Sequence, residues 1–311
     1  MKYLTLVPSQ LPFNLDLSLS CGQIFGWKKS GNTWVGIHKN KFISIRQSRD
    51  RIWYCGATED EITRFLGLTD SMDIILTSIR EHINAYRGES DDFFETMYHQ
   101  SSGLRILRQD PWECLVSFIC SANSNVSTIS KRIGLILQRH GTPCTPHAHA
   151  FPDPQTMSRC SEHELRACLS GYRAPYLIKT AQYIHEYPGF FDQVAQCCYD
   201  DAKKILMTLP GVGPKVADCV LLFAFEHLNA VPVDIRIRKI MEREYADLMP
   251  PSTLKRRSYE SIASFCREYF GPYAGYAQQF LFATRDTEND AYQKPGVTGA
   301  TTMHVHKAVR E

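Results

Sequence analysis

Lys215 and Asp234, which lie 19 residues apart, are the two side chains whose positions suggest chemistry. Lys215 follows Pro214 at the expected start of a helix, where the helix dipole disfavours the charged form of the amine. An uncharged lysine amine is a nucleophile that can attack a sugar carbon. Asp234 precedes another expected helix, so its carboxylate would stay ionised and could stabilise a cation or move protons. The pair therefore predicts covalent amine catalysis.

Both residues also have ordinary structural interpretations. Lysine is most often a solvated surface residue, and an aspartate in front of a helix most often caps it. Capping and catalysis are compatible at Asp234. Cys219 lies four residues after Lys215 on the same helix face, and a thiolate there could hold the ammonium group. We therefore expect Cys219 beside the amine.

The turn in front of Lys215 could hold an anion. Gly211, Val212 and Gly213 separate two segments with helical spacing. Two glycines leave backbone N–H groups uncovered, and the positive end of the next helix favours a phosphate. An ordinary turn between helices is the alternative. Because the upstream segment is helical, a hairpin that grips a phosphodiester backbone is favoured over a dinucleotide-binding motif, which would require a preceding strand.

The elements that must position these residues begin with a sheet. Residues 1–56 have alternating apolar positions, β-branched residues and turns at 30–32 and 39–40, which is the pattern of a small antiparallel sheet. Strands are expected at 4–8, 33–37, 41–46 and 51–54.

From Glu59 the apolar spacing becomes helical, behind the capping residue Thr58. We predict an α+β fold, with a small N-terminal antiparallel β-sheet domain at 1–85, a mostly α-helical body containing the helix-hairpin-helix at 86–285, and a flexible C-terminal tail at 286–311. Within the body, helices are expected at 113–122, 126–139, 161–170, 175–186, 201–209, 214–226, 235–245, 255–270 and 273–284, with loops at 141–146 and 151–154.

Composition narrows the class of protein. The net charge of +2 is small for 311 residues, so any affinity for nucleic acid must come from local clusters. No apolar run approaches the roughly 20 residues that span a bilayer, and no signal-peptide pattern is present. We therefore expect an intracellular protein with no membrane contact.

The 11 cysteines are scattered, without a CxxC pair or zinc spacing, which favours free thiols in a reducing compartment. Only Cys266 follows Cys219, so the chain has no four-cysteine cluster after the central stretch. We expect no metal site formed by side chains.

The stretch LPGVGPKVADCV…AVPVD at 209–234 resembles the helix-hairpin-helix glycosylase superfamily, known as HhH-GPD. Within it, the chain is similar to the 8-oxoguanine DNA glycosylases over about residues 8–285. Four further blocks carry that resemblance, at 21–27, 108–121, 171–174 and 271–278.

The resemblance implies a bifunctional enzyme of base excision repair. Such an enzyme flips an oxidised guanine out of double-stranded DNA, cuts its glycosidic bond and nicks the strand by β-elimination. Lys215 falls on the family's Schiff-base nucleophile and Asp234 on its essential carboxylate. Double-stranded DNA containing oxidised guanine is thus the expected partner.

The base pocket follows from the same resemblance. Gly22 falls where the family uses a backbone carbonyl to accept the N7–H that distinguishes the oxidised base from guanine. Gln278 falls on the residue that reads the Watson–Crick edge, while Phe282 and Cys219 would sandwich the ring. Packing into the core is the alternative for Gln278 and Phe282, which are four residues apart on one helix face.

On the opposite strand, Asn123 would fill the gap left by the flipped base, Tyr172 would wedge beside the orphaned base and Arg173 would read it as cytosine. Two positions depart from the family pattern. Thr128 stands where a second cytosine-reading arginine is expected, which predicts relaxed preference for the opposite base. Arg236 stands where animal enzymes use a histidine near a DNA phosphate, and it can still contact phosphate, as can the backbone of 211–213.

We expect no cofactor, and the missing cysteines exclude the iron–sulfur cluster that some members of the superfamily carry, while a structural cation held by the hairpin carbonyls fits the superfamily. We expect a monomer, located in the nucleus if eukaryotic and in the cytoplasm at the nucleoid if prokaryotic. Two alternatives stay open: a non-catalytic helix-hairpin-helix DNA-binding module, and a glycosylase for another damaged base, such as a formamidopyrimidine or an alkylated base.

Overall fold

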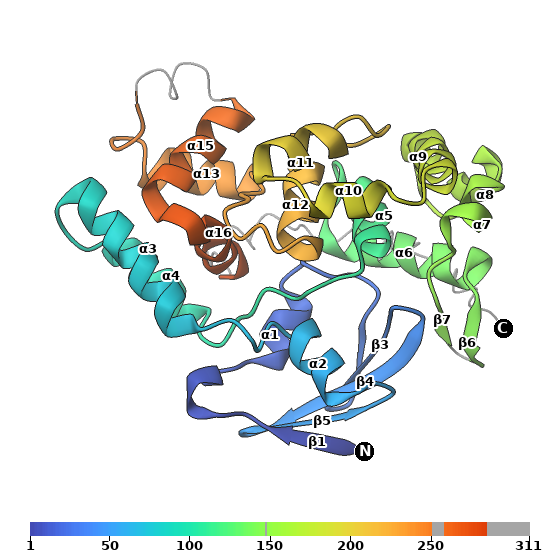
Figure 1. Ribbon diagram of the computed structural model, residues 1–311, viewed down its shortest axis with the longest axis horizontal. Helices are drawn as coiled ribbons and strands as arrows, with labels where there is room; N and C mark the ends of the chain where they lie inside the picture. Colours follow the sequence, from blue (N-terminus) through green and yellow to red (C-terminus); the bar gives the residue numbers. More distant parts are fainter. Residues whose placement is uncertain (147, 251–257, 285–311) are drawn as a thin grey trace, which may run out of the picture.

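A computed structural model describes residues 1–146, 148–250 and 258–284. In Figure 1 a five-stranded sheet lies below a larger body of helices, and the chain runs from the blue sheet through the green and yellow helices to the orange ones. The predicted tail at 286–311 and the first residues of the helix predicted at 255–270 lie outside the described residues.

The amino-terminal sheet is antiparallel throughout, with the strand order β1-β5-β4-β3-β2. Lys39 and Asn40 make the turn between the third and fourth strands with φ of 50° and 61°, the left-handed conformation that tight hairpin turns need. The strands are β1 Lys2–Thr5, β2 Lys28–Ser30, β3 Thr33–His38, β4 Lys41–Ser48 and β5 Arg51–Cys55.

Three predicted strands are confirmed as β3, β4 and β5. The first strand was predicted at 4–8 but spans Lys2–Thr5, because Val7 and Pro8 already turn away. β2 was not predicted, because its three residues are all exposed and carry no apolar alternation.

Two helices, α1 Leu15–Ser20 and α2 Glu59–Phe65, pack against the sheet (Figure 1). The predicted cap of α2 is confirmed, since Thr58 and Glu61 form a reciprocal capping box. α1 was not predicted because six residues give too little periodicity. Apolar residues from the strands and from both helices form one buried cluster, which includes Leu15, Trp34, Ile43, Ile52 and Phe65.

The helical body confirms most of the predicted helices, with ends displaced by a few residues. The short helices α4, α7 and α10 were missed, and the loop predicted at 141–146 contains part of a small hairpin, β6 Pro143–Thr145 with β7 Ala148–His149. The helices are α3 Met72–Arg87, α4 Asp92–Gln100, α5 Pro111–Ser121, α6 Val126–His140, α7 Pro154–Ser158, α8 Glu162–Ala167, α9 Ala174–Glu186, α10 Phe190–Ala195, α11 Tyr199–Leu206, α12 Pro214–Ala224, α13 Ile235–Glu244, α15 Tyr259–Phe270 and α16 Ala274–Ala283, with 3-10 turns at Pro8–Gln10, Gly171–Arg173 and Gly271–Tyr273.

Segments far apart in the sequence lie side by side in the body. The cyan helices α3 and α4 pack against the orange helices α15 and α16 (Figure 1). The buried face of α3, formed by Met72, Ile75, Ile79 and Ile83, belongs to the main core. The helices before residue 100 thus complete the body, and the division predicted between residues 85 and 86 stays a prediction.

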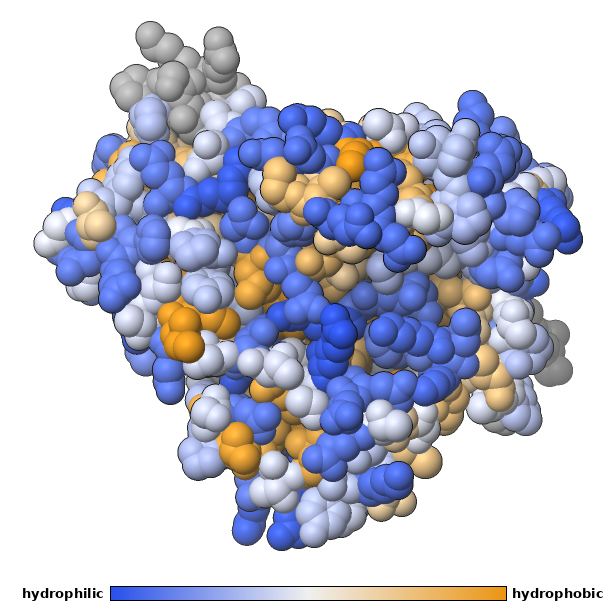
Figure 2. Space-filling view, viewed as in Figure 1, coloured by the Kyte–Doolittle hydropathy of each residue, from blue (hydrophilic) through white to orange (hydrophobic). Residues whose placement is uncertain are grey.

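Hydrophilic residues cover most of the face seen in Figure 2, and apolar residues reach the surface only in small separate areas. Within the ranges that the structure describes, no helix combines the length and the apolar character needed to cross a membrane.

Candidate active site

The turn between α11 and α12 is a tight hairpin between two helices, as predicted. Gly211 has φ of 79°, and a Cβ there would lie 2.7 Å from Cβ of Tyr176, so the position requires glycine. Thr180 donates a hydrogen bond of 2.8 Å to the carbonyl of Pro210, and Val212 is buried. The hairpin is therefore held rigidly against α9. A helix precedes the turn, which excludes the dinucleotide-binding interpretation.

The start of α12 is open. Gly213 is its extended N-cap residue and Pro214 its first residue, and no side chain caps the helix. A Cβ on Gly213 would meet nothing within 4 Å. The first N–H groups of this helix of 11 residues are therefore available to an anion.

Lys215 is half-buried in the first turn of α12. Its Nζ lies 3.0 Å from Oγ of Ser121 and 5.0 Å from the centroid of the Phe118 ring. The hydroxyl of Ser121 in turn donates to the carbonyl of Phe118 at 2.7 Å. The end of α5 thus fixes the amine, and this use of Ser121 was not predicted.

Asp234 is the N-cap of α13, and its Oδ1 accepts a hydrogen bond of 2.8 Å from the N–H of Ile237. The capping prediction is confirmed. No ion pair joins Asp234 to Lys215 in the part of the chain that the structure describes. Within the described ranges the second oxygen of Asp234 has no hydrogen-bond or ion-pair partner, so this oxygen could contact another group, such as a cationic sugar.

Cys219 is buried on α12 beside Lys215. Burial raises the pKa of its thiol to about 12, with the charges of Asp218 and Asp234 adding to the effect and the Lys215 ammonium opposing it. At neutral pH the thiol is therefore protonated. The predicted thiolate–ammonium pair is wrong, because desolvation of the sulfur outweighs the attraction of the neighbouring ammonium.

A buried polar cluster joins α11 to α12. Oδ2 of Asp218 lies 2.9 Å from Nζ of Lys203, and Oδ1 accepts a hydrogen bond of 2.7 Å from the hydroxyl of Tyr199. Burial raises the pKa of the Asp218 carboxyl, and the Lys203 ammonium opposes this. The two helices of the hairpin are thus joined by a desolvated ion pair.

Tyr259 extends this cluster to the chain that leads to Asp234. Its hydroxyl donates to Oδ2 of Asp218 at 2.5 Å and accepts from the N–H of Val233 at 3.3 Å, and the carbonyl of Val231 lies 3.1 Å from the same oxygen. Asp218 lies three residues after Lys215 on α12. The cluster therefore connects the helix that carries Lys215 to the segment that ends at Asp234.

Gly22 and Phe282, predicted to face the same base, lie next to each other. Gly22 has φ of 96°, and a Cβ there would lie 3.4 Å from Cε1 of Phe282 and 3.2 Å from Cγ2 of Val126. The guanidinium of Arg236 lies 5.7 Å from the centroid of the Phe282 ring, and among the residues that the structure describes its Nε has no hydrogen-bond partner. These residues come from the amino-terminal loop, α6, α13 and α16, so only the fold brings them together.

Gln278 lies one turn before Phe282 on α16 and is buried. Its Oε1 accepts a hydrogen bond of 2.7 Å from Nε2 of Gln279. One acceptor position of the Gln278 amide is therefore used by its neighbour. The role predicted for Gln278, reading a base edge, stays a prediction, as does the sandwich of Phe282 and Cys219.

The residues predicted for the opposite strand also lie together. Asn123 has φ of 49° and donates a hydrogen bond of 3.2 Å to the hydroxyl of Tyr172, whose ring is exposed. The guanidinium of Arg173 lies 4.3 Å from the centroid of that ring and is buried, where it donates to the carbonyl of Ala122 and to Ser124 Oγ. Asn123 and Tyr172 thus lie side by side, as two residues that together enter a DNA duplex would have to. Arg173 instead holds the loop that carries Asn123.

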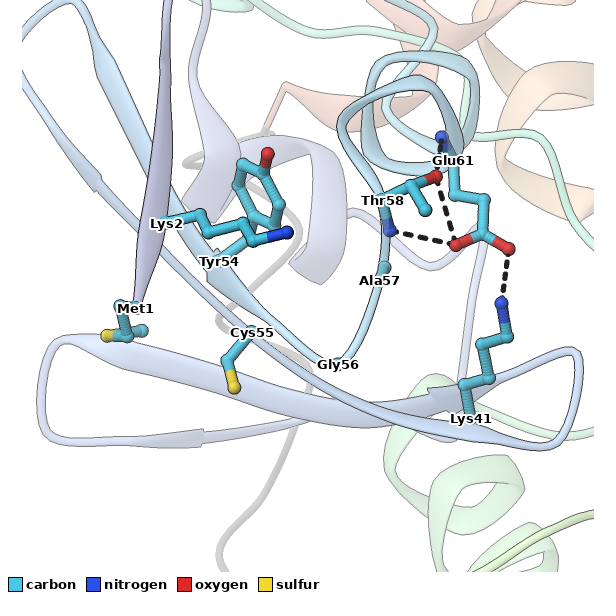
Figure 3. Close-up of a pocket in the computed structure, with 9 residues that line it drawn as sticks. All are labelled: Met1, Lys2, Lys41, Tyr54, Cys55, Gly56, Ala57, Thr58 and Glu61. Atoms are coloured by element: carbon cyan, nitrogen blue, oxygen red, sulfur yellow. Dashed lines mark hydrogen bonds and ion pairs between the residues drawn. The ribbon is translucent and has the colours of Figure 1, made fainter.

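The hollow drawn in Figure 3 lies elsewhere. It measures about 580 Å³ and opens at the edge of the amino-terminal sheet, where Lys41 pairs with Glu61 at 2.5 Å. It contains none of the predicted site residues. Within the described ranges, no group of three or more His, Cys, Asp or Glu could hold a metal ion.

Comparisons with known proteins match most of the chain. The family described as "8-oxoguanine DNA glycosylase, N-terminal domain" matches residues 5–115, and the family described as "HhH-GPD superfamily base excision DNA repair protein" matches residues 116–272. The N-glycosylase/DNA lyase OGG1 of Arabidopsis thaliana is 32% identical over 90% of this chain and 80% of its own length.

Among solved structures, the 8-oxoguanine glycosylase/lyase of Clostridium acetobutylicum, in complex with double-stranded DNA containing cytosine opposite 8-oxoguanine, is 29% identical with a TM-score of 0.77. That similarity covers 87% of this chain and 91% of the other. A 3-methyladenine DNA-glycosylase from Archaeoglobus fulgidus shares the fold at 17% identity. The chain therefore belongs to the HhH-GPD superfamily of base excision DNA repair proteins, in the branch that carries the 8-oxoguanine DNA glycosylase amino-terminal domain.

Proposed function

We propose that this protein excises 8-oxoguanine from double-stranded DNA and then cleaves the strand at the resulting abasic site. The observation that carries the proposal is the half-buried Lys215 amine, fixed by Ser121 on a helix that is joined through a buried cluster to the segment ending at Asp234. The relatives named N-glycosylase/DNA lyase support both activities.

The chemistry follows from these two residues. The amine of Lys215 forms a bond to C1′ as the bond from C1′ to the base nitrogen breaks, and the departing base takes the electron pair. The free carboxylate oxygen of Asp234 stabilises the cationic sugar and moves protons. The sugar ring then opens: the C1′–O4′ bond breaks, O4′ takes a proton, and loss of a proton from the lysine nitrogen leaves an imine at C1′. The imine acidifies C2′, and loss of a C2′ proton expels the 3′ phosphate and breaks the strand.

The neighbouring residues would select the base. The carbonyl of Gly22 would accept the N7–H of 8-oxoguanine, Phe282 and Cys219 would stack on the flipped ring, and Gln278 would bind its Watson–Crick edge. On the other strand, Asn123 and Tyr172 would fill the gap. The adjacency of Gly22 and Phe282 supports this assignment.

The backbone of 211–213 and Arg236 would hold DNA phosphates, because the first N–H groups of α12 are uncapped. We propose that the chemistry needs no cofactor, that any cation at the hairpin is structural, and that the protein acts as a monomer. Its substrate would place it inside the cell, in the nucleus of a eukaryote or at the nucleoid of a prokaryote.

Borohydride trapping tests the proposal. A duplex with 8-oxoguanine opposite cytosine is incubated with wild type, with Lys215→Gln and with Lys204→Gln, an exposed lysine of the same hairpin, in the presence of EDTA. Wild type and Lys204→Gln should give a cleaved strand and a trapped covalent adduct. Lys215→Gln should lose the adduct, and its cleavage should fall at least about a thousandfold, because the nucleophile is gone.

Two outcomes would count against the proposal. Tight DNA binding without cleavage of any oxidised-purine duplex would indicate a binding module. Excision of a formamidopyrimidine or an alkylated base, with 8-oxoguanine left intact, would indicate a different lesion.

A further inference from the structure

The extended segment 104–109, which connects α4 to α5, is buried along its whole length between the amino-terminal lobe and the helical body. Each backbone N–H from Arg105 to Gln109 donates a hydrogen bond, and each acceptor belongs to a different residue. In chain order the acceptors are Oγ of Ser18 at 3.0 Å, the hydroxyl of Tyr276 at 3.4 Å, Oε1 of Gln23 at 2.9 Å, the carbonyl of Phe65 at 2.9 Å and the carbonyl of Phe223 at 2.8 Å.

On one side the segment holds Gln23, the residue directly after Gly22. Nε2 of Gln23 donates to the carbonyl of Arg105 at 2.8 Å, and its Oε1 accepts from the N–H of Leu107. The carbonyl of Gln23 accepts a further hydrogen bond of 2.5 Å from Nε2 of Gln109. Gln23 is 1% exposed, so water does not replace these bonds.

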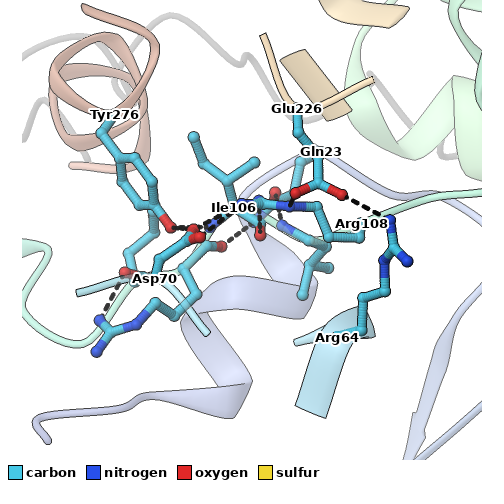
Figure 4. A network of polar contacts seen from close by, with 10 residues as sticks. Gln23, Arg64, Asp70, Ile106, Arg108, Glu226 and Tyr276 are labelled. Carbon is cyan, nitrogen blue, oxygen red and sulfur yellow. Dashed lines mark hydrogen bonds and ion pairs between the residues drawn. The ribbon is translucent and has the colours of Figure 1, made fainter. Parts of the chain in front are cut away.

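On the other side the segment holds α16. The hydroxyl of Tyr276 accepts from the N–H of Ile106 and donates to Asp70, whose carboxylate also binds Arg108 through two contacts of 2.7 Å (Figure 4). Arg108 also lies 3.2 Å from Glu226, in the loop after α12. The segment is therefore anchored to the body from several directions.

These two sides meet at the base pocket. Gly22 precedes Gln23, while Gln278 and Phe282 follow Tyr276 on α16. We infer that Gln23 is a positioning residue for base selection: by binding the buried segment, it sets the place of the Gly22 carbonyl relative to Gln278. This inference rests on the proposed function.

The inference separates the two activities of the enzyme. Excision of 8-oxoguanine requires a correctly placed Gly22 carbonyl, whereas cleavage at a preformed abasic site requires only Lys215, Asp234 and DNA binding. A structural role for Gln23 would affect both activities equally, because it would change the fraction of folded protein. A positioning role changes excision alone.

The test compares both rates in wild type and in Gln23→Leu, a change that keeps the volume and removes the hydrogen bonds. Excision of 8-oxoguanine should fall at least about tenfold, since a displacement of ~1 Å costs up to about a hundredfold. Cleavage of a duplex with a preformed abasic site should change by less than about twofold. In Gln23→Leu, excision of normal guanine should not fall by the same factor as excision of 8-oxoguanine.

Gln47→Leu is the matched control. Gln47 bridges the backbone in the same way in the same lobe, accepting from the N–H of Leu15 at 2.8 Å and donating to the carbonyl of Phe13 at 2.7 Å. Its partners Leu15 and Phe13 are not residues of the predicted pocket, so the ratio of the two rates should stay at the wild-type value. Tyr276→Phe, which removes only the hydroxyl that accepts from Ile106, should shift the ratio in the same direction as Gln23→Leu and carries the test if Gln23→Leu does not fold.

A wild-type protein that cleaves abasic DNA and leaves 8-oxoguanine intact would overturn the proposed function, and this inference with it. Given excision by wild type, equal losses of both rates in Gln23→Leu and Tyr276→Phe, or no loss in either, would overturn the inference alone. A ratio altered equally by Gln47→Leu would also overturn it.

Discussion

Arg173 and Thr128 stand at the two positions predicted to read the opposite base. Arg173 is buried and donates to the loop that carries Asn123, so part of its hydrogen-bonding capacity is already used. Thr128 lies in the first turn of α6, where its N–H donates to Oδ1 of Asn125 at 2.9 Å. The buried guanidinium of Arg173 does not extend into solvent, and Thr128 has no guanidinium. Both observations favour weak discrimination between opposite bases.

We therefore predict that wild type excises 8-oxoguanine opposite C, A, G and T at rates within about tenfold of one another, because a good bidentate contact, worth about 1–3 kcal/mol, is missing. Thr128→Arg should restore a preference for cytosine of about tenfold. Single-turnover rates on four duplexes measure this. Ser127→Arg, which adds the same charge one residue earlier, is the control and should not sharpen the preference. A wild type that strongly prefers cytosine would refute the prediction.

At the scale of elements, the two glycines of the hairpin have different tasks. Gly211 has positive φ and lies in contact with Tyr176, whereas Gly213 has ordinary extended backbone and faces open space at the start of α12. The first is therefore required by folding. The second is required only if a bulky ligand approaches the backbone closely.

Alanine substitution separates these tasks. Gly211→Ala should destabilise the protein by about 1–3 kcal/mol, because it combines an unfavourable backbone conformation with a clash against Tyr176. Gly213→Ala should leave the melting temperature unchanged, because a Cβ there meets no other atom within 4 Å. It should weaken binding to double-stranded DNA, because the added methyl group would keep a DNA phosphate away from the backbone N–H groups. Thermal unfolding and DNA titration measure the two effects. Wild-type affinity in Gly213→Ala would mean that DNA does not contact this turn.

At the scale of the whole molecule, the predicted site residues come from both the amino-terminal lobe and the helical body. Lys215 comes from α12, Ser121 from α5, Asp234 from the start of α13, Phe282 from α16 and Gly22 from the loop after α1. Stability of the small lobe should therefore matter for activity as well as for folding.

One buried histidine links the stability of that lobe to pH. His38 is 7% exposed and lies against Phe65, with ring centroids 4.7 Å apart. Burial lowers its pKa to about 4 from the ordinary 6.5, and the neighbouring Lys39 adds to the effect. Between pH 6.5 and 4 the unfolded chain thus binds the proton more tightly than the folded chain. Its stabilising contribution is present above pH 6.5 and is lost as the pH falls towards 4.

The expected loss is about 3 kcal/mol, since each pKa unit corresponds to about 1.4 kcal/mol. Denaturant unfolding of wild type and His38→Leu from pH 8 to pH 4 measures it as the difference in slope. His38→Leu should lose stability less steeply than wild type, whereas His163→Gln, an exposed histidine, should keep the wild-type slope. Parallel curves for wild type and His38→Leu would rule out this account.

Much of the fold and part of the site could be read from the sequence. The hairpin, the caps at Thr58 and Asp234 and most of the helices depend on residues within a few positions of one another, so local spacing and turn chemistry were enough. The short elements α1, α4 and β2 were missed because few residues give little periodicity. The thiolate at Cys219 was predicted wrongly because burial cannot be judged from spacing.

The sequence by itself determined which residues have the chemistry: a lysine at a helix start, a capping aspartate and glycines at a turn. Only the tertiary structure decided their surroundings. It placed Lys215 on Ser121, Gly22 on Phe282 and Asp218 between Lys203 and Tyr259. These contacts join residues far apart in the chain, and their energy comes from burial and from satisfying polar groups inside the protein. No local pattern carries that information, because a buried partner exists only once the chain has folded.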